Sequence, residues 1–358
     1  MKFSSMKTID IHALLRPHLR KLTPYSSARD EYTGKLGTFL DANENPLGSA
    51  APGRHNRYPD PLARELKQSL RSILGVKEEQ LFVGNGSDEA IDLLFRAFCE
   101  PGQDRVVLLP PTYGMYKVSA EINGVETVEY PLTEAFQIDL DKIRTDLLPK
   151  TKLIFVCSPN NPTGNCIHQA SIEALLEWMA EDGLVVVDEA YVDFAPQQKL
   201  IPLLDKYPHL VLLRTFSKAW GMANLRLGMA IGHPDLIAAL NKIKAPYNVN
   251  GMSQQLALEA IQQEDKKIEM VDLIVQERNN LARELNNISF VSRVYPSDAN
   301  FLLVRVDHAR QRYEELINKR IIVRDRSRVI LCDECLRFTI GSPDENEELL
   351  QALQHMSK

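Results

Sequence analysis

Hydrophobic and polar positions in the middle of the chain alternate between two patterns. Nearly continuous apolar runs, typical of buried strands, occur at 105–109, 153–156, 184–187, 211–213 and 226–232. Between them lie amphipathic segments. One ends at Gly183 and has the i, i+3, i+4, i+7 spacing of a helix at Ile172, Leu175, Leu176 and Met179. This alternation predicts an α/β fold with a mostly parallel central sheet flanked by helices.

The two ends of the chain have different patterns. The first fifty residues are rich in proline, glycine and charge, which favours an arm. After residue 250 come long polar helical segments, strand-like runs, and a final helix with Ser342 and Glu345 as a capping box. We therefore expect three parts: an N-terminal arm (1–50), a large domain (51–250) and a smaller α/β C-terminal domain (251–358).

Composition narrows the function classes. The 358 residues are 44% hydrophobic, enough for a sizeable core, and the net charge of −6 argues against nucleic acid as a partner. No run has the length of a membrane span, and we expect a cytoplasmic protein. Five cysteines form no disulfide framework, and Cys332 and Cys335 lack the second pair or nearby histidines of a zinc site. We expect two reduced thiols and no metal.

Chemically versatile side chains follow four of the apolar runs. In chain order they are Tyr113; Asn160 and Asn161; Asp188, Glu189 and Tyr191; and Ser217 and Lys218. Each alone has an ordinary explanation: a turn asparagine, a capping aspartate, a surface lysine. Because ligands bind at the carboxyl ends of parallel strands, we expect these residues to share one site.

Together these groups match the needs of pyridoxal phosphate. The cofactor requires an amine for its Schiff base and a carboxylate for its ring nitrogen, which we assign to Lys218 and Asp188. The ring's phenolic oxygen would be met by Tyr191 and Asn161, and its face by Tyr113. Its phosphate would be met by Ser217, Arg226 and a helix N-terminus.

The segment 81–98 is a candidate for that helix N-terminus. It predicts a strand, a Gly-Asn-Gly turn and a helix, so the free amides of Gly86, Ser87 and Asp88 would bind an anion. Against this, Asp88 and Glu89 would repel phosphate unless they point away, and a plain capped helix start is an equal alternative. The third glycine of a dinucleotide fingerprint is absent.

Several stretches resemble one enzyme family over nearly the whole chain. "SPNNPTG" (158–164), "VVDEAYVDF" (186–194) and "TFSKAWGMANLRLG" (215–228) are similar to the core of fold type I pyridoxal-phosphate aminotransferases. Finer features resemble the histidinol-phosphate aminotransferase subfamily: "LDANENPLG", "RYPDP", "GNGSDEAIDLLFRAF", "RDRS" and "CLRFTIGSPDEN".

The resemblance implies transamination of L-histidinol phosphate with 2-oxoglutarate, by a ping-pong reaction of histidine biosynthesis. It implies a homodimer in which Tyr58 reaches the neighbouring subunit's cofactor phosphate, while Tyr25 closes over the substrate. Arg337 would bind the carboxylate of glutamate or 2-oxoglutarate and the phosphate of the other substrate, with Arg324 assisting. Without the resemblance, both arginines would be ordinary surface residues.

Three rival functions share parts of this pattern. An aromatic amino acid aminotransferase and a phosphothreonine-type decarboxylase would use the same core. A regulatory domain that binds pyridoxal phosphate is a non-enzyme alternative, although such regulators usually carry a DNA-binding module and no basic helix-turn-helix segment precedes the fold.

Overall fold

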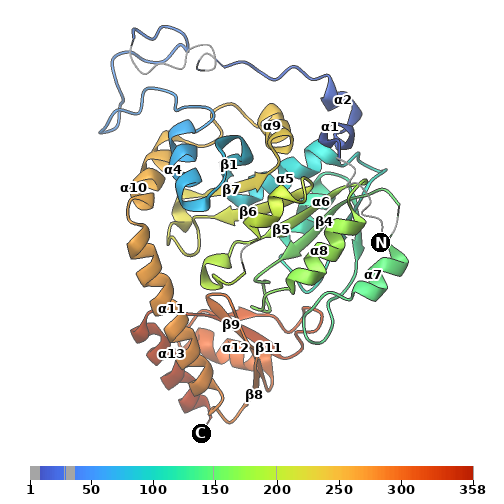
Figure 1. Cartoon of the computed structure of the whole chain (residues 1–358). Helices are drawn as coiled ribbons and strands as arrows, with labels where there is room; N and C mark the ends of the chain where they lie inside the picture. The colour runs from blue at the N-terminus through green and yellow to red at the C-terminus, as the bar shows by residue number, and fades with distance from the viewer. Residues whose placement is uncertain (1–8, 28, 30–36, 148, 199, 358) are drawn as a thin grey trace.

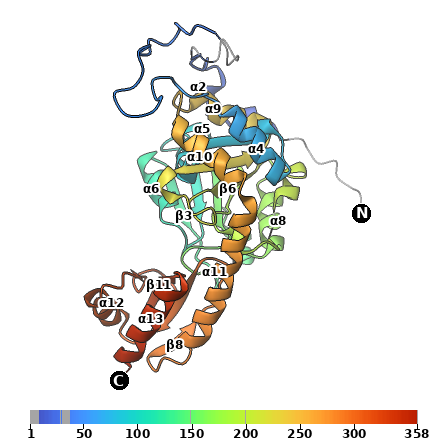
Figure 2. The same ribbon diagram turned by 90° about the vertical axis from the view of Figure 1, so that its left-hand side faces the viewer.

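The computed structural model describes residues 9–27, 29, 37–147, 149–198 and 200–357. It has a large part built on a seven-stranded sheet and a small C-terminal part built on a four-stranded sheet (Figure 1). The long helix α11 (Glu264–Leu285) runs from one part to the other (Figure 2).

The large sheet has the strand order β1-β7-β6-β5-β4-β2-β3. Its strands are β1 (Leu81–Asn85), β2 (Arg105–Leu108), β3 (Glu126–Glu129), β4 (Thr151–Cys157), β5 (Leu184–Asp188), β6 (Leu210–Thr215) and β7 (Leu227–Gly232). Strands β2 to β6 are parallel, which confirms the predicted sheet, whereas β7 is antiparallel to both β1 and β6. The connection from β6 to β7 contains only a short 3-10 turn, too little for the crossover that a parallel strand requires.

Helices cover both faces of the large sheet. They are α4 (Arg64–Leu74), α5 (Gly86–Phe98), α6 (Met115–Ile122), α7 (Leu140–Asp146), α8 (Gln169–Trp178), α9 (Pro234–Ile243) and α10 (Gly251–Ile261). Because successive strand residues point to opposite faces, Val185 and Val187 join a core with α4 and α8, while Val186 joins one with α5, α6 and α9. This three-layer packing fixes the ends of the strands, where the candidate residues lie.

The small part is antiparallel throughout, with the order β10-β11-β9-β8. Its strands are β8 (Val291–Val294), β9 (Phe301–Val306), β10 (Arg324–Asp325) and β11 (Cys335–Thr339), and α11, α12 (Ala309–Asn318) and α13 (Pro343–Met356) share its core. The predicted capping box is confirmed, because the Ser342 side chain accepts from the Glu345 amide and Glu345 accepts in return. One strand-like run of the C-terminal domain, residues 320–325, forms a strand only over its last two residues.

The N-terminal segment is only partly an arm. Residues 11–20 form the short helices α1 (Ile11–Leu14) and α2 (Pro17–Arg20), and the side chains of Ile11, Leu14 and Leu15 are buried in the core of the large part. The expectation that all of 1–50 is an arm is therefore wrong for this stretch, because its apolar residues have helical spacing. Residues 37–59 form no helix or strand, and this segment loops away from the body at the end opposite the small part (Figure 2). Within the described part of the chain, none of the helices has the length and apolar character needed to cross a bilayer.

Candidate active site

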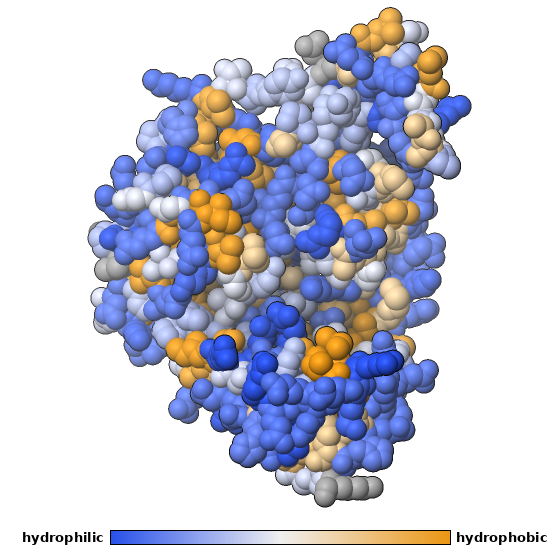
Figure 3. Space-filling model, turned by 180° about the vertical axis from the view of Figure 1, so that it is seen from behind, coloured by the Kyte–Doolittle hydropathy of each residue, from blue (hydrophilic) through white to orange (hydrophobic). Residues whose placement is uncertain are grey.

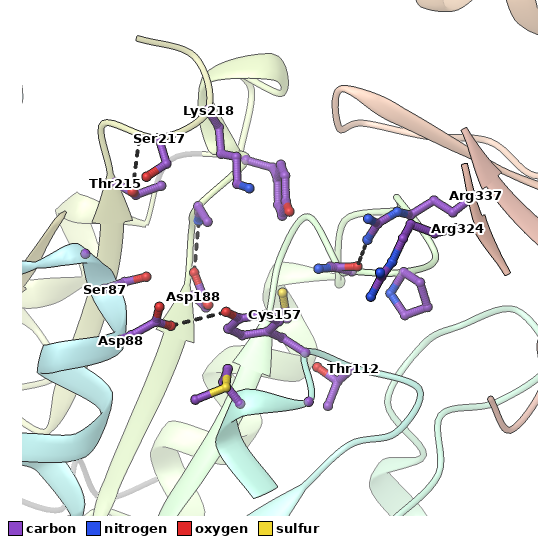
Figure 4. A pocket seen from close by; sticks show the side chains of 18 of the residues that line it. Ser87, Asp88, Thr112, Cys157, Asp188, Thr215, Ser217, Lys218, Arg324 and Arg337 are labelled. Atoms are coloured by element: carbon purple, nitrogen blue, oxygen red, sulfur yellow. Dashed lines mark hydrogen bonds between the residues drawn. The ribbon is translucent and has the colours of Figure 1, made fainter. Parts of the chain in front are cut away.

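A cavity of about 570 Å³ lies where the large and small parts meet. Seen from behind, the surface between the two parts is hollowed, with strongly hydrophilic side chains along the edge of the small part (Figure 3). The strand ends and the α5 N-terminus face the β10–β11 hairpin across the cavity (Figure 4). The predicted site residues that line it are Gly86, Ser87, Asp88, Tyr113, Asn161, Asp188, Tyr191, Ser217, Lys218, Arg226, Arg324 and Arg337.

The two tyrosines assigned from the resemblance lie elsewhere on this chain, and Asn160 and Glu189 do not line the cavity either. Tyr58 is 52% exposed and stacks on Tyr247 with 4.4 Å between ring centroids, beside a separate groove. Tyr25 is 74% exposed and lies on another part of the surface. The resemblance implies that Tyr58 acts at a neighbouring subunit's site.

Asp188 is a buried carboxylate at the end of β5. It accepts hydrogen bonds from the Tyr116 hydroxyl (2.7 Å) and the Ala190 amide (3.0 Å). Burial raises its pKa to about 6, although both hydrogen bonds oppose the rise. Among the described residues no cation forms a salt bridge with Asp188, and a buried charge in that position is costly. A cationic ring nitrogen placed against it would offset that cost.

Lys218 extends into the cavity from the connection after β6 (Figure 4). Within the described residues its ammonium has no hydrogen bond or ion pair, and Nζ lies 5.4 Å from the centre of the Tyr191 ring. Burial, followed by the charge of Arg337, lowers the pKa of Lys218. A lowered pKa favours the neutral amine, which is the form that acts as a nucleophile and as a base.

The N-terminus of α5 lies at the cavity, where its free amides would form an anion cradle. Gly86 has φ +70°, which lets the helix start directly after β1. Gly228 of β7 packs so closely that a Cβ there would lie 2.3 Å from the Ser87 amide nitrogen. Because Gly86 and Gly228 have no side chain, the backbone amides at the start of α5 can lie close together at one point of the cavity.

The two acidic residues of this first turn lie differently with respect to the cavity. Glu89 points away and accepts from the backbone amide of Asn85 (2.6 Å) and from the side chain of Asn248 (3.1 Å). Asp88 stays at the cavity, where it pairs with Arg226 at 3.4 Å and accepts from the Tyr113 hydroxyl at 3.2 Å. Glu89 therefore meets the condition for an anion site, whereas the Asp88 carboxylate remains at the cavity, paired with Arg226.

Arg337 of β11 approaches from the small part. Its Nη1 donates a hydrogen bond to Asn161 Oδ1, which joins the small part to the loop after β4 (Figure 4). Burial, followed by the nearby Arg326 and Arg324 charges, lowers the pKa of Arg337 to about 10. The opposite end of the cavity from the cradle is therefore strongly cationic.

Sequence reasoning missed three residues of the site: Tyr116, Thr215 and Arg326. Tyr116 follows the predicted Tyr113 by one helical turn, and Arg326 follows Arg324 by the two-residue period of a strand, so spacing gave a signal for both. Thr215 accepts from the Ser217 amide at 3.1 Å and orders the turn before Lys218.

Asn160, a candidate alongside Asn161, is turned away from the cavity. Its side-chain amide donates to Pro111 O and Thr163 Oγ1, both at 2.8 Å, and holds two loops together. Cys332 and Cys335 are buried free thiols, and burial raises the pKa of both. The described residues contain no group of three or more histidine, cysteine or acidic side chains placed to hold a metal ion.

Residues 31–353 match the protein family described as aminotransferase class I and II. The chain is 51% identical over 344 residues to the histidinol-phosphate aminotransferase of Cytophaga hutchinsonii, covering 96% of this chain and 98% of that one. Its structure is similar to that of histidinol-phosphate aminotransferase from Clostridium acetobutylicum, with a TM-score of 0.78 and 26% sequence identity. The match covers 85% of this chain and 91% of that one. The structure is also similar to that of the enzyme of the same name from Sinorhizobium meliloti, solved in complex with pyridoxal-5'-phosphate, with a TM-score of 0.76 and 24% sequence identity. That match covers 96% of this chain and 97% of the other.

Proposed function

Because the chain belongs to the class I and II aminotransferase family, we propose that it transfers the amino group of L-histidinol phosphate to 2-oxoglutarate, with pyridoxal phosphate as cofactor. The products are imidazole-acetol phosphate and glutamate, and the reaction belongs to histidine biosynthesis. The observation that carries this proposal is that Lys218 and the buried Asp188 line the same cavity as a cluster of arginines.

The residues of the cavity fit the cofactor. Lys218 would hold it covalently through Nζ, and the buried Asp188 would face its ring nitrogen. Tyr113 would pack on the face of the ring, and Tyr191 and Asn161 would contact its phenolic oxygen. The phosphate would be bound by Ser217, Arg226 and the backbone amides of Gly86, Ser87 and Asp88. When bound, pyridoxal phosphate supplies an electron sink that stabilises negative charge on the substrate carbon.

Two side chains control protons during turnover. At neutral pH Asp188 is mainly ionised, because its pKa is about 6, so it keeps a proton on the ring nitrogen beside it. Lys218, with its lowered pKa, would accept the proton from the substrate carbon at Nζ as the neutral amine, and would donate it again from Nζ later in the same half-reaction.

The arginines of the small part bind the anionic end of both substrates. Histidinol phosphate presents a phosphate and glutamate a carboxylate, and the planar guanidinium group donates paired hydrogen bonds to either. Arg324 and Arg337 are cross-strand neighbours that line the cavity. One site can therefore serve the two substrates in turn, as a ping-pong reaction requires.

A second copy of the chain would complete the site. Tyr58, Met252 and Leu256 line a groove outside the cavity and are 52%, 58% and 38% exposed. The backbone amide of Tyr58 donates to the buried Glu44 carboxylate at 2.6 Å, which fixes the segment that presents this ring. A homodimer would cover these apolar side chains and bring Tyr58 to the partner's cofactor phosphate. The buried free thiols suit the reducing cytoplasm, where we place the reaction.

Mixing two inactive variants tests the shared site. Lys218→Ala and Tyr58→Ala homodimers should each have strongly reduced activity. Their hybrid dimers should regain it, because one of the two sites then contains neither substitution. Absence of recovery in hybrids shown to form would contradict a site shared between subunits.

The proposed reaction is tested with the purified protein loaded with pyridoxal phosphate. Glutamate formation from 2-oxoglutarate is measured with histidinol phosphate and with aromatic amino acids as donors, and carbon dioxide release is measured with phosphothreonine. We expect histidinol phosphate to give the highest kcat/KM and no carbon dioxide to appear. Faster turnover of an aromatic donor, or release of carbon dioxide, would overturn the substrate assignment.

A further inference from the structure

The β10–β11 hairpin places three arginines on one face. Arg324 lies directly opposite Arg337, and the backbone N–H of Arg326 donates to Cys335 O at 2.9 Å, which continues the same register. Because alternate residues of a strand point to the same side, Arg324, Arg326 and Arg337 share the face that lines the cavity. Like charges directly opposite each other destabilise a strand pair, so this arrangement needs compensation.

The surrounding residues do not supply that compensation. Across the part of the chain that the structure describes, none of the three guanidinium groups forms a salt bridge, and the buried Nε atoms of Arg326 and Arg337 have no hydrogen-bond partner. Two of the acids in the hairpin have other partners: Asp325 accepts from Ser327 and lies 3.8 Å from Arg310, and Glu334 accepts from the Ala309 amide. Within the described residues, Arg337 donates to the neutral amide of Asn161, and its guanidinium lies 5.1 Å from the centre of the Phe301 ring. The cluster therefore carries positive charge that a ligand must neutralise.

The two proposed substrates differ in how much charge they bring to this end. A carboxylate carries one negative charge, whereas a phosphate monoester carries about 1.5 to 2 at pH 7 and has three acceptor oxygens. Arg324 and Arg337 together offer enough donors for a carboxylate. The half-buried Arg326, which has an unsatisfied donor, is in excess of that need.

We propose that Arg326 is a specificity-determining residue, which supplies the third positive charge that favours a phosphate monoester over a carboxylate at this end of the cavity. This inference rests on the proposed function, since it names how that site distinguishes its two substrates. The three arginines then have different roles. Arg324 and Arg337 bind either anion, and Arg326 adds affinity for the more highly charged phosphate.

Kinetics of the two half-reactions test this role. In Arg326→Gln, the ratio of kcat/KM for histidinol phosphate to kcat/KM for glutamate should fall at least about tenfold, and Arg326→Lys should restore most of it. Arg328→Gln removes the same charge from an exposed position of the same loop, and should leave both values unchanged. An equal loss for both substrates in Arg326→Gln, or no loss for either, would overturn the proposal.

Binding of inorganic phosphate separates this inference from the proposed function. Calorimetric titration of phosphate into the holoenzyme requires no turnover, and the Arg326→Gln holoenzyme should bind phosphate at least about fivefold more weakly than wild type and Arg328→Gln. If the wild type fails to transaminate histidinol phosphate but this difference is found, the substrate is wrong and the role of Arg326 stands. If histidinol phosphate is a substrate but all three proteins bind phosphate equally, the role of Arg326 is refuted.

Discussion

Replacing Asp188 by Asn should stabilise the cofactor-free protein while it weakens cofactor binding. Burial raises the pKa of Asp188 from 3.8 to about 6, so folding at neutral pH must bury a charge that the unfolded chain keeps in water. A pKa raised in the folded state means that stability is fully present below pH 3.8 and is lost as the pH rises through about 6. An Asn side chain is neutral at every pH, so folding of the variant buries no charge at this position. Its amide can donate to the Tyr116 hydroxyl, which also accepts hydrogen bonds.

The size of the effect follows from the shift in pKa. A rise of about two pH units, at 1.36 kcal/mol per unit, makes ionised Asp188 cost about 3 kcal/mol at pH 7.5. The same relation gives a cost of about 1 kcal/mol at pH 4.5, where most of the folded protein has a neutral Asp188. Asp188→Asn should therefore gain up to about 3 kcal/mol of unfolding free energy at pH 7.5 and about a third of that at pH 4.5.

Urea unfolding of the apoproteins at both pH values measures this gain. Glu189→Gln is the matched control, because Glu189 is equally buried but pairs with Arg214 at 2.8 Å. Removing that carboxylate leaves the largely buried Arg214 cation without its partner, so this variant should be destabilised at pH 7.5. An Asp188→Asn apoprotein that is less stable than wild type at pH 7.5, or a gain that does not change with pH, would refute the reasoning.

Three further substitutions test individual contacts. Tyr116→Phe removes the 2.7 Å hydrogen bond to Asp188 and should raise the pKa of that carboxyl by about 1 to 2. The acid-side loss of cofactor affinity, followed by absorbance titration, should then begin at correspondingly higher pH. Gly228→Ala should cost about 1–3 kcal/mol and displace the Ser87 amide, so phosphate-dependent cofactor affinity falls together with the melting temperature. Ser342→Ala removes the helix cap and should cost about 1 kcal/mol in chemical unfolding, with kcat unchanged.

The sheet and the residues at its strand ends could be predicted because each depends on local pattern. Uninterrupted apolar runs such as 184–187 have few structural alternatives, and the carboxyl ends of parallel strands must share an edge. The pattern alone therefore predicts that Asp188 and Lys218 share one site. The capping box at Ser342 was equally local.

Features that depend on long-range packing could not be predicted in this way. The antiparallel direction of β7 depends on the length of its connection, and the docking of residues 11–20 depends on an apolar surface made by α5 and α9. Tyr116 reads as an ordinary helical aromatic until the fold places its hydroxyl 2.7 Å from a carboxylate 72 residues away. Arg326 gained significance only from the register of β10 with β11.

The central claim is that Lys218 is the amine that holds the cofactor, and borohydride reduction followed by peptide mapping tests it most directly. Reduction of the holoprotein should fix the cofactor on the single peptide that contains Lys218, and Lys218→Ala should take up no label. Lys67 is the informative competitor, because it is also buried and burial lowers its pKa to about 8, yet it lies outside the cavity. Label on Lys67 or on any other lysine, or full labelling of Lys218→Ala, would contradict the account.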